Sequence, residues 1–314
     1  MVKIKDLKEK DHLKTNLMLK SCTKGTTSKG SPYLNLVFQD NTGSIDGKLW
    51  DAKVQDEANA VQGHVVEVQF EVLEYNRNLQ LRVNRILDLD QSTIDLSEYI
   101  ISSTMSRSES ESMFAELLAS LKNENLRILV SGMLDKVGDS YFKYPAASRI
   151  HHSYMGGLAE HSLGMVRLAE QVAELYPLLN RDLLIAGAMI HDMGKTAELG
   201  GMISSEYTDQ GRLLGHISIA QAWLAEVAEE KGIADSEEAV LLRHMVLSHH
   251  GKYEFGSPVL PEIPEAEALS LIDNLDARMN TLTGILEGVK PGQWTQRIFS
   301  MENRQFYKAK GSAK

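Results

Sequence analysis

The chain has 314 residues, of which 43% are hydrophobic and 24% charged, ordinary values for a folded protein of more than one domain. Its formal net charge of −10 argues against indiscriminate nucleic-acid binding, because phosphate contacts depend on Lys and Arg. Residues 1–90 are balanced in charge, however, so the acidic excess lies further along and a nucleic-acid substrate stays open.

Targeting and redox signals are few. No stretch approaches the roughly 20 apolar residues that a membrane helix requires. The opening residues, MVKIKDLKEKDHLKTN, lack the apolar core of a signal peptide. The single cysteine, Cys22, rules out an internal disulfide framework and fits a reducing compartment. We therefore expect a cytoplasmic protein with no membrane partner.

Apolar and polar residues alternate between about residues 12 and 88, most clearly at 66–72. Such alternation predicts half-buried antiparallel strands, and turn-forming residues separate five stretches of this kind. We expect a small antiparallel β-barrel whose interior is filled by Phe38, Trp50 and Phe70.

The stretch YLNLVFQDNTGSIDGKLWD, preceded by a long loop from Thr23 to Pro32, resembles an OB-fold of the nucleic-acid-binding type. Such folds hold single-stranded oligonucleotides with the first long loop and the hairpin between strands 4 and 5. Flat rings suit base stacking, and cations suit the phosphate backbone. The resemblance points to six nucleic-acid-binding residues: Lys24, Lys29, Tyr33, Tyr75, Arg77 and Arg82. For Tyr33, Tyr75 and Arg77 a plain solvated surface is an equal alternative.

The pattern changes between residues 91 and 112, which end in the serine-rich SSTMSRSESES. We predict a first domain at 1–94, a linker or helix lead-in at 95–112, and a second domain at 113–314. From Met113 the apolar period becomes helical. At least six helices are expected, in the segments 113–134, 158–176, 181–194, 217–230, 237–250 and 265–282. The predicted fold is multidomain, with an OB-type barrel followed by an all-α bundle.

The strongest local signal is an apolar helix that ends in the adjacent His191 and Asp192. Gly194 follows, a residue type that commonly ends helices. Neighbouring helix residues point about 100° apart, so other helices must complete a chelate. Candidate ligands lie one helix apart along the chain: His161, His216, His249 with His250, and Asp273. Imidazoles and carboxylates without thiolates suit a hydrolytic site for a divalent metal rather than structural zinc.

This ordered set resembles the HD-domain phosphohydrolase superfamily over roughly residues 115–290, in the variants that hold two or more metals. The resemblance implies a first metal with Asp192 as a bridging ligand and a second metal beside it. The implied ligands are His161, His191, Asp192 and Asp273 for the first metal, and His216, His249 and His250 for the second. The chain lacks the Gly-Tyr-Pro element that follows the paired histidines in the cyclic-dinucleotide-cleaving branch, so that branch is disfavoured.

The whole chain, with the segment IHHSYMGGLAEHSLGM at 150–165, resembles the YhaM-type bacterial 3′→5′ exoribonucleases. The resemblance implies an enzyme that uses Mn²⁺, two or more ions per chain, and shortens single-stranded RNA to nucleoside 5′-monophosphates by metal-activated water. Single-stranded DNA stays open as a second substrate, and a homo-oligomer as the assembly. The polarity of cleavage rests on the resemblance alone.

Further residues near the motif are candidates for supporting roles. Lys195 follows the His-Asp pair and is expected to act with Asp192 by binding the scissile phosphate as a point charge. His244 lies about 140° around the helix from His249 and should face away from the site. Four residues are candidates for substrate contact or for orienting a ligand, against capping or ordinary ion pairing: His151, His152, Asp276 and Arg278.

Two other functions stay open from the sequence. The first is an HD enzyme that hydrolyses free nucleotides or a small phosphoester, with the barrel as a regulatory module. The second is a non-enzymatic protein that binds single-stranded nucleic acid, with the helical domain as a scaffold. Barrel substitutions separate the first from an exonuclease, and metal analysis separates the second.

Overall fold

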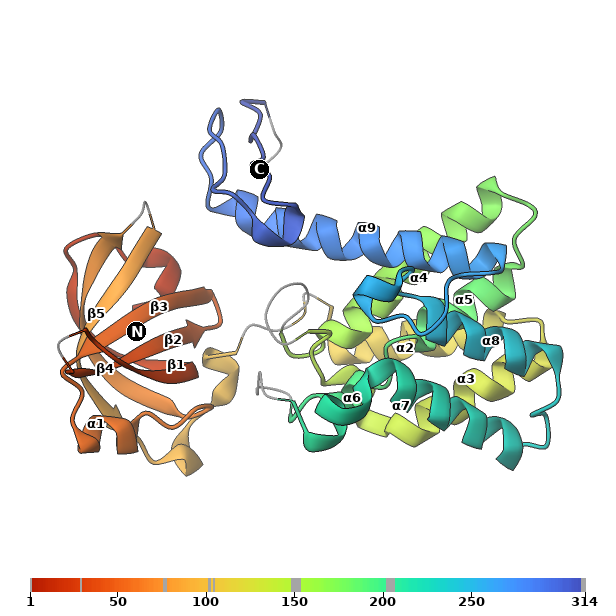
Figure 1. The fold of residues 1–314 in the computed structure, drawn as a ribbon, viewed down its shortest axis with the longest axis horizontal. Coiled ribbons are helices and arrows are strands. Elements are labelled where there is room, and N and C mark those ends of the chain that lie inside the picture. The colour runs from red at the N-terminus through yellow and green to blue at the C-terminus, as the bar shows by residue number, and fades with distance from the viewer. Residues whose placement is uncertain are drawn as a thin grey trace. The chain divides into compact units, whose positions relative to one another are not determined.

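A computed structural model describes residues 2–28, 30–75, 78–100, 103, 105–147, 154–201 and 207–311. The chain divides into two compact units, the first holding the strands and the second holding the long helices, all of which lie after Met105 (Figure 1). Within these ranges, no helix combines the length and the apolar character needed to cross a membrane.

The first unit is a closed barrel with the strand order β1-β2-β3-β5-β4. Its strands are β1 (His12–Thr26), β2 (Pro32–Asp40), β3 (Gly43–Trp50), β4 (Val65–Tyr75) and β5 (Asn78–Asp88). Neighbouring strands are antiparallel except β3 and β5, which are parallel. The short helix α1 (Val54–Asn59) connects β3 to β4. This five-stranded closed order is that of an OB-fold and confirms the predicted barrel.

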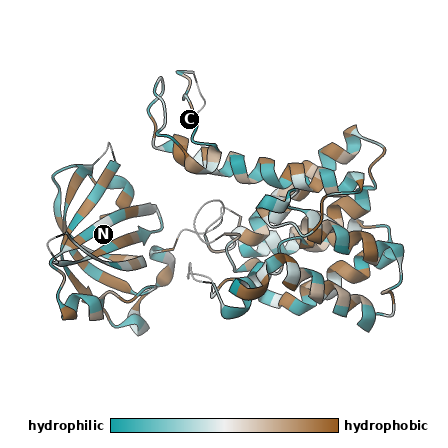
Figure 2. Ribbon diagram, viewed as in Figure 1, coloured by the Kyte–Doolittle hydropathy of each residue, from teal (hydrophilic) through white to brown (hydrophobic). Residues whose placement is uncertain are grey.

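Apolar and polar residues alternate along the strands, as the bands in Figure 2 show. The apolar side chains fill the interior of the barrel. On β4 the alternate residues Val66, Val68, Phe70 and Val72 are buried, while the residues between them are more exposed. Gly47 on β3 leaves room for a large ring, because an added Cβ would lie only 2.8 Å from the Phe38 side chain. The interior of the barrel is therefore filled by packed side chains.

Two expectations about the barrel are wrong. Residues 23–26 extend β1 and pair with β2, so the first loop is shorter than predicted and Lys24 lies on a strand. Trp50 does not fill the interior, because 47% of it is exposed. It follows Leu49, which is buried, and the alternation of a strand turns the next side chain outward.

The second unit is helical. Its helices are α2 (Arg107–Ser120), α3 (Glu124–Val137), α4 (Gly157–Leu175), α5 (Arg181–Ile190), α6 (Lys195–Glu198), α7 (Asp209–Glu230), α8 (Glu237–Ser248) and α9 (Pro264–Glu287). Short 3-10 turns lie at η1 (Ile4–Asp6), η2 (Gln91–Thr93), η3 (Leu96–Glu98), η4 (Gly138–Phe142), η5 (Tyr253–Phe255) and η6 (Phe299–Met301).

Side-chain caps explain where five helices begin. Each cap accepts a hydrogen bond from a backbone N–H in the first turn, which satisfies one of the amides that a helix leaves free. The caps are Ser106, Asn123, Asn180, Thr208 and Ser236. Asn123 divides the segment 113–134 into α2 and α3.

Helix α5 lies at the centre of the helical unit. Its residues from Asp182 to Ile190 are all buried, and α3, α4, α8 and α9 pack around it. A helix that is apolar on all sides belongs inside a bundle. The residues that follow it, His191 and Asp192, are consequently in the interior, and both are buried.

Candidate metal centre

Five helices bring the seven predicted ligands together. His161 lies on α4, His191 and Asp192 follow α5, His216 lies on α7, His249 and His250 follow α8, and Asp273 lies on α9. Three groups have ligand atoms within 4.8 Å of one another: His161, His191 and Asp273; His191, Asp192 and His249; and His216, His249 and His250. The three groups share members, so they form one continuous cluster.

The Asp192 carboxylate lies in the middle of this cluster. Its Oδ2 is 3.3 Å from His191 Nε2 and 3.6 Å from His161 Nε2. Its Oδ1 is 3.5 Å from His216 Nε2 and 3.6 Å from His249 Nε2. The two oxygens face different pairs of imidazoles, an arrangement suited to a carboxylate shared between two cations.

Backbone carbonyl groups fix the tautomer of three imidazoles. Nδ1 of His191, His249 and His250 donates to a carbonyl oxygen at 3.1, 2.7 and 2.7 Å, respectively. A carbonyl can only accept, so Nδ1 carries the hydrogen and a neutral ring presents a lone pair at Nε2. Burial lowers the pKa of His249 and of His250, which favours the neutral rings.

Carboxylates hold the other two imidazoles. Asp276 Oδ2 lies 2.7 Å from His161 Nδ1, and Glu198 Oε1 lies 3.0 Å from His216 Nδ1. Burial opposes protonation of His161, but hydrogen bonds with Asp273 and Asp276 outweigh it and raise the pKa of His161 to about 9. Histidines that bind metals commonly have such a partner at the second nitrogen.

Several inward-facing atoms have no hydrogen-bond partner within the described part of the chain. They are Nε2 of His191, His216 and His249, and Oδ1 of Asp192. Each such buried atom costs about 1–3 kcal/mol, and imidazole lone pairs that face a carboxylate repel it. A divalent cation among them would satisfy nitrogen and oxygen atoms together, so the residues present fit a metal.

A partly buried lysine accompanies the central carboxylate. Lys195 Nζ lies 2.6 Å from Asp192 Oδ2. Burial alone would raise the pKa of Asp192, but the Lys195 ammonium holds it well below its ordinary value. Burial alone would lower the pKa of Lys195, and Asp192 reverses that effect. Both groups are therefore charged.

Glu198 is a candidate that sequence reasoning missed. Gly215, with a φ of 71°, interrupts α7 and frees the backbone N–H of His216 from the helix. That N–H donates to Glu198 Oε1 at 3.0 Å, and the same oxygen faces His216 Nδ1. The only sequence signal is an acidic residue shortly after the His-Asp pair, which looks like any solvated glutamate.

Gly194 serves close packing rather than helix termination. The helix α5 ends at Ile190, and Gly194 does not adopt the left-handed conformation of a terminating glycine. A Cβ at this position would lie 2.1 Å from the carbonyl oxygen of His216. The expectation of a helix-ending glycine is wrong, and the glycine instead lets the turn approach α7.

Some predicted residues do not join the cluster. Arg278 pairs with Glu302, with 2.9 Å between Nη1 and Oε1. His244 faces away from the cluster as expected, since its Nε2 accepts the backbone N–H of Glu262 at 3.0 Å. Four candidates lie outside the described residues: Lys29, Arg77, His151 and His152.

The outer face of the barrel carries an aromatic platform. The Tyr33 and Trp50 rings pack with their centroids 5.2 Å apart. Lys48 Nζ lies 5.1 Å from the Tyr33 ring and 4.8 Å from the Trp50 ring. Tyr75, at the end of β4, is 65% exposed. These side chains are available for stacking.

Two predicted cations of the barrel have acidic partners. Lys24 Nζ lies 2.7 Å from Glu57 Oε1, and Arg82 pairs with Glu71. Because exposed ion pairs contribute little free energy, phosphate groups can compete for both cations.

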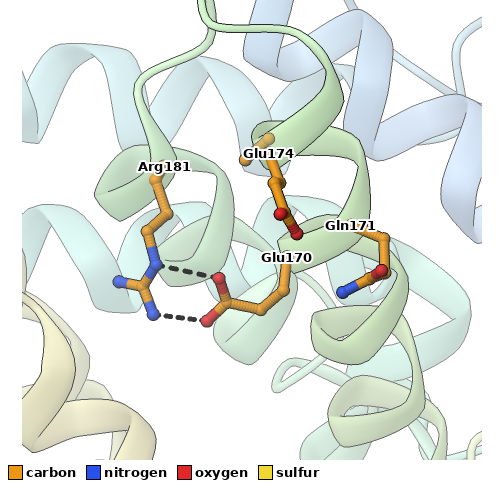
Figure 3. A pocket seen from close by; sticks show the side chains of 5 residues that line it. Glu170, Gln171, Glu174 and Arg181 are labelled. Atoms are coloured by element: carbon orange, nitrogen blue, oxygen red, sulfur yellow. Dashed lines mark hydrogen bonds and ion pairs between the residues drawn. The ribbon is translucent and has the colours of Figure 1, made fainter.

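A surface pocket of the helical unit is separate from the cluster. Figure 3 shows it beside the ion pair between Arg181 and Glu170, in which Arg181 Nε lies 2.9 Å from Glu170 Oε2. Arg181 begins α5 and His191 follows its end, a separation of roughly 15 Å along the axis at 1.5 Å per residue. This pocket holds a structural ion pair.

Comparison with known proteins covers both units. The HD domain family matches residues 158–278, a range that contains all seven residues of the cluster. A "3'-5' exoribonuclease YhaM" from Geobacillus sp. (strain WCH70) is 44% identical over 93% of this chain and 90% of its own length. Proteins of that name from Bacillus subtilis (strain 168) and Listeria monocytogenes serotype 4b (strain F2365) are 43% and 41% identical, each over 93% of both chains.

A solved structure is also similar to part of this chain. It is the second OB-fold domain of replication protein A from Methanococcus maripaludis, with 24% identity, 30% of this chain and 98% of that chain covered, and a TM-score of 0.23. The assignment of the barrel as an OB-fold rests on its own strand order.

Proposed function

The chain belongs to the family of 3′-5′ exoribonucleases named YhaM, and we infer that it is a metal-dependent phosphodiester hydrolase that shortens RNA from the 3′ end. The helical unit is the hydrolytic part, because it holds the cluster. The names of the relatives favour this function over a hydrolase of free nucleotides and over a binding protein without activity.

The observation that carries this proposal is the position of Asp192. Its two oxygens face four imidazole Nε2 atoms at 3.3–3.6 Å, inside a buried cluster. We propose that these residues hold two divalent metals, with Asp192 shared between them. The first set is His161, His191, Asp192 and Asp273; the second is Asp192, His216, His249 and His250.

Mn²⁺ is the proposed metal. Imidazole and carboxylate ligands suit Mn²⁺, Fe²⁺ and Zn²⁺, and the cluster contains no thiolate that would favour structural zinc. Metal analysis of the purified protein by mass spectrometry tests the identity and the number of ions per chain. A cytoplasmic location is also proposed, supported by the single unpaired cysteine.

When bound, such metals supply Lewis-acid chemistry, which makes water a nucleophile near neutral pH and offsets charge on the phosphoryl oxygens. The protonated Lys195 adds a fixed positive charge for the scissile phosphate. Asp276 and Glu198 hold the imidazoles of His161 and His216 in place. Attack of water on phosphorus with loss of the 3′-oxygen leaves a 3′-hydroxyl on the strand and releases a nucleoside 5′-monophosphate.

The barrel is proposed to bind the single strand. Stacking of bases on aromatic rings tolerates any sequence, and a nearby cation favours the backbone. Tyr33, Trp50, Lys48 and Tyr75 supply these groups on its outer face. Single-stranded DNA can stack in the same way, so the proposal includes it as a second substrate.

A 5′-labelled single-stranded RNA incubated with the protein and Mn²⁺ tests the function. Trimming from the 3′ end gives a ladder of progressively shorter labelled strands. Immediate release of a labelled mononucleotide would show attack at the 5′ end and overturn the proposed polarity. The same assay with a labelled DNA strand ranks the two substrates.

A further inference from the structure

The chain that follows the paired histidines carries aromatic side chains into solvent. Tyr253 is 64% exposed and Phe255 is 55% exposed, on the short turn η5. Side chains of this size are normally buried, and apolar groups that gather at a surface commonly mark a binding site. We call the segment 252–256 the aromatic turn.

The aromatic turn is tied directly to the cluster. The carbonyl oxygen of Phe255 accepts the Nδ1 hydrogen of His250 at 2.7 Å. His250 also belongs to the group formed with His216 and His249. A single imidazole thus separates the backbone that carries the Phe255 ring from the candidate metal centre.

The ends of the aromatic turn are fixed. Gly251 has a φ of 75°, and a Cβ there would lie 2.3 Å from Ser270 Oγ on α9, so the chain turns closely against that helix. Gly256, with a φ of 96°, reverses the chain after the turn, and Ser257 is buried. The turn is therefore held beside the cluster while its rings stay exposed.

The chemistry of the turn matches a nucleotide. Lys252 Nζ lies 5.4 Å from the centroid of the Phe255 ring. A nucleobase stacks on an aromatic face, and an adjacent ammonium group binds a phosphate. An apolar peptide would pack on the rings, but it would offer no anionic group to the lysine and no phosphodiester to the neighbouring hydrolytic cluster.

We propose that the aromatic turn is a base-stacking subsite of the hydrolytic centre, in which Tyr253 and Phe255 hold a base next to the scissile phosphate and Lys252 neutralises the strand. This rests on the proposed function. It adds a subsite in the helical unit itself, independent of the platform on the barrel. The turn then places the end of the strand, while the barrel binds more distant nucleotides.

The test compares an intact 5′-labelled RNA with two matched strands that lack the base of the last or of the penultimate nucleotide. The wild-type protein is expected to cleave at least one abasic strand with a KM raised about tenfold, the effect of losing one stacked base. The double variant Tyr253→Ala/Phe255→Ala is expected to show that raised KM on intact RNA and no further rise on abasic strands. Adding one ring back, in the variant Tyr253→Ala/Phe255→Trp, should restore the difference in KM between intact and abasic strands.

Two matched controls separate stacking from damage to the site. Glu254→Ala changes the same turn without removing a ring, and Phe299→Ala removes a ring that is 87% exposed elsewhere in the unit. Both should behave like the wild type, and the double variant should keep the wild-type metal content. Loss of metal and of kcat, with discrimination against abasic strands retained, would show that the rings only support His250 and would overturn the proposal.

Failure of the subsite is distinguishable from failure of the function. A wild-type protein that releases no nucleotide from any strand contradicts the proposed function, and the subsite with it. An active wild-type protein whose double variant keeps the same KM on every strand contradicts the subsite alone.

Discussion

At the scale of single residues, the histidines of the cluster are each held from outside. Glu198 does this for His216. Burial alone would raise the pKa of Glu198, but the side-chain and backbone hydrogen bonds from His216 and the nearby positive charge of Lys195 together lower it. Glu198→Ala should lower Mn²⁺ affinity about 10–100-fold, the usual cost of losing such a partner. Glu198→Gln, which keeps an acceptor oxygen, should recover part of it. Calorimetric titration of metal into the metal-free variants measures both.

The control for Glu198 is Glu226→Ala, which removes an exposed carboxylate of α7 that pairs with Lys136. It should leave metal affinity unchanged. If Glu198→Ala bound Mn²⁺ as tightly as this control, Glu198 would be a structural residue and nothing more.

The acid-base state of His161 predicts how metal binding depends on pH. Its pKa in the metal-free protein is raised to about 9, so at pH 7 the ring holds a proton that a metal must displace. Burial lowers the pKa of His249 and of His250, so these rings have no extra proton to lose. Metal affinity should rise as pH increases towards 9, by about tenfold per unit for one proton.

Calorimetry in two buffers of different ionisation enthalpy measures the number of protons released on Mn²⁺ binding. The expected value near pH 7 is about one or more. Affinity that stays constant between pH 7 and pH 9, with no proton release, would contradict the protonated state of His161.

At the scale of elements, the turn after α5 depends on the absence of one side chain. Gly194→Ala would place a Cβ 2.1 Å from the His216 carbonyl oxygen, so α7 must move. We expect a loss of about 1–3 kcal/mol in the free energy of unfolding. Urea unfolding followed by helical circular dichroism measures it, since the helices lie almost entirely in the second unit.

The exposed Gly284 of α9 provides the matched control, because an added Cβ there meets nothing within 4 Å. Gly284→Ala should stabilise the helix by up to about 1 kcal/mol. Equal effects of the two substitutions would contradict the close approach at Gly194.

Helices and strands were predictable where the pattern of apolar residues extended over many positions. The alternation of β4 and the apolar run of α5 gave the correct structure type, because burial on one face or on all sides leaves a periodic trace. Boundaries were less predictable. The split at Asn123 and the extension of β1 through Thr26 depend on a cap and on strand pairing, which periodicity does not register.

The cluster itself was predictable because its ligands are rare residue types at the ends or on the faces of separate helices. Glu198 was not, since its role comes from the break at Gly215, a tertiary feature. For Trp50 the prediction itself was wrong. Aromatic character suggested the core, while its place one residue after Leu49 turned it to solvent.

At the scale of the whole molecule, we propose that the two units divide the work between strand binding and hydrolysis. Trp50→Ala should raise the KM for a long RNA about tenfold through lost stacking, with little change in kcat or in hydrolysis of a dinucleotide. Trp294→Ala, which removes an exposed indole of the helical unit, is the control. An equal effect of Trp50→Ala on long and short substrates would contradict a strand-binding role for the barrel.

The rate of nucleotide release by Asp192→Ala tests most directly whether the cluster around Asp192 performs the hydrolysis. Removal of this carboxylate takes away a group that faces both sets of imidazoles, while the barrel should stay folded and still bind RNA. We predict that release of nucleotides from single-stranded RNA in the presence of Mn²⁺ falls to the background without protein. Release at the wild-type rate would contradict the assignment of the metal centre.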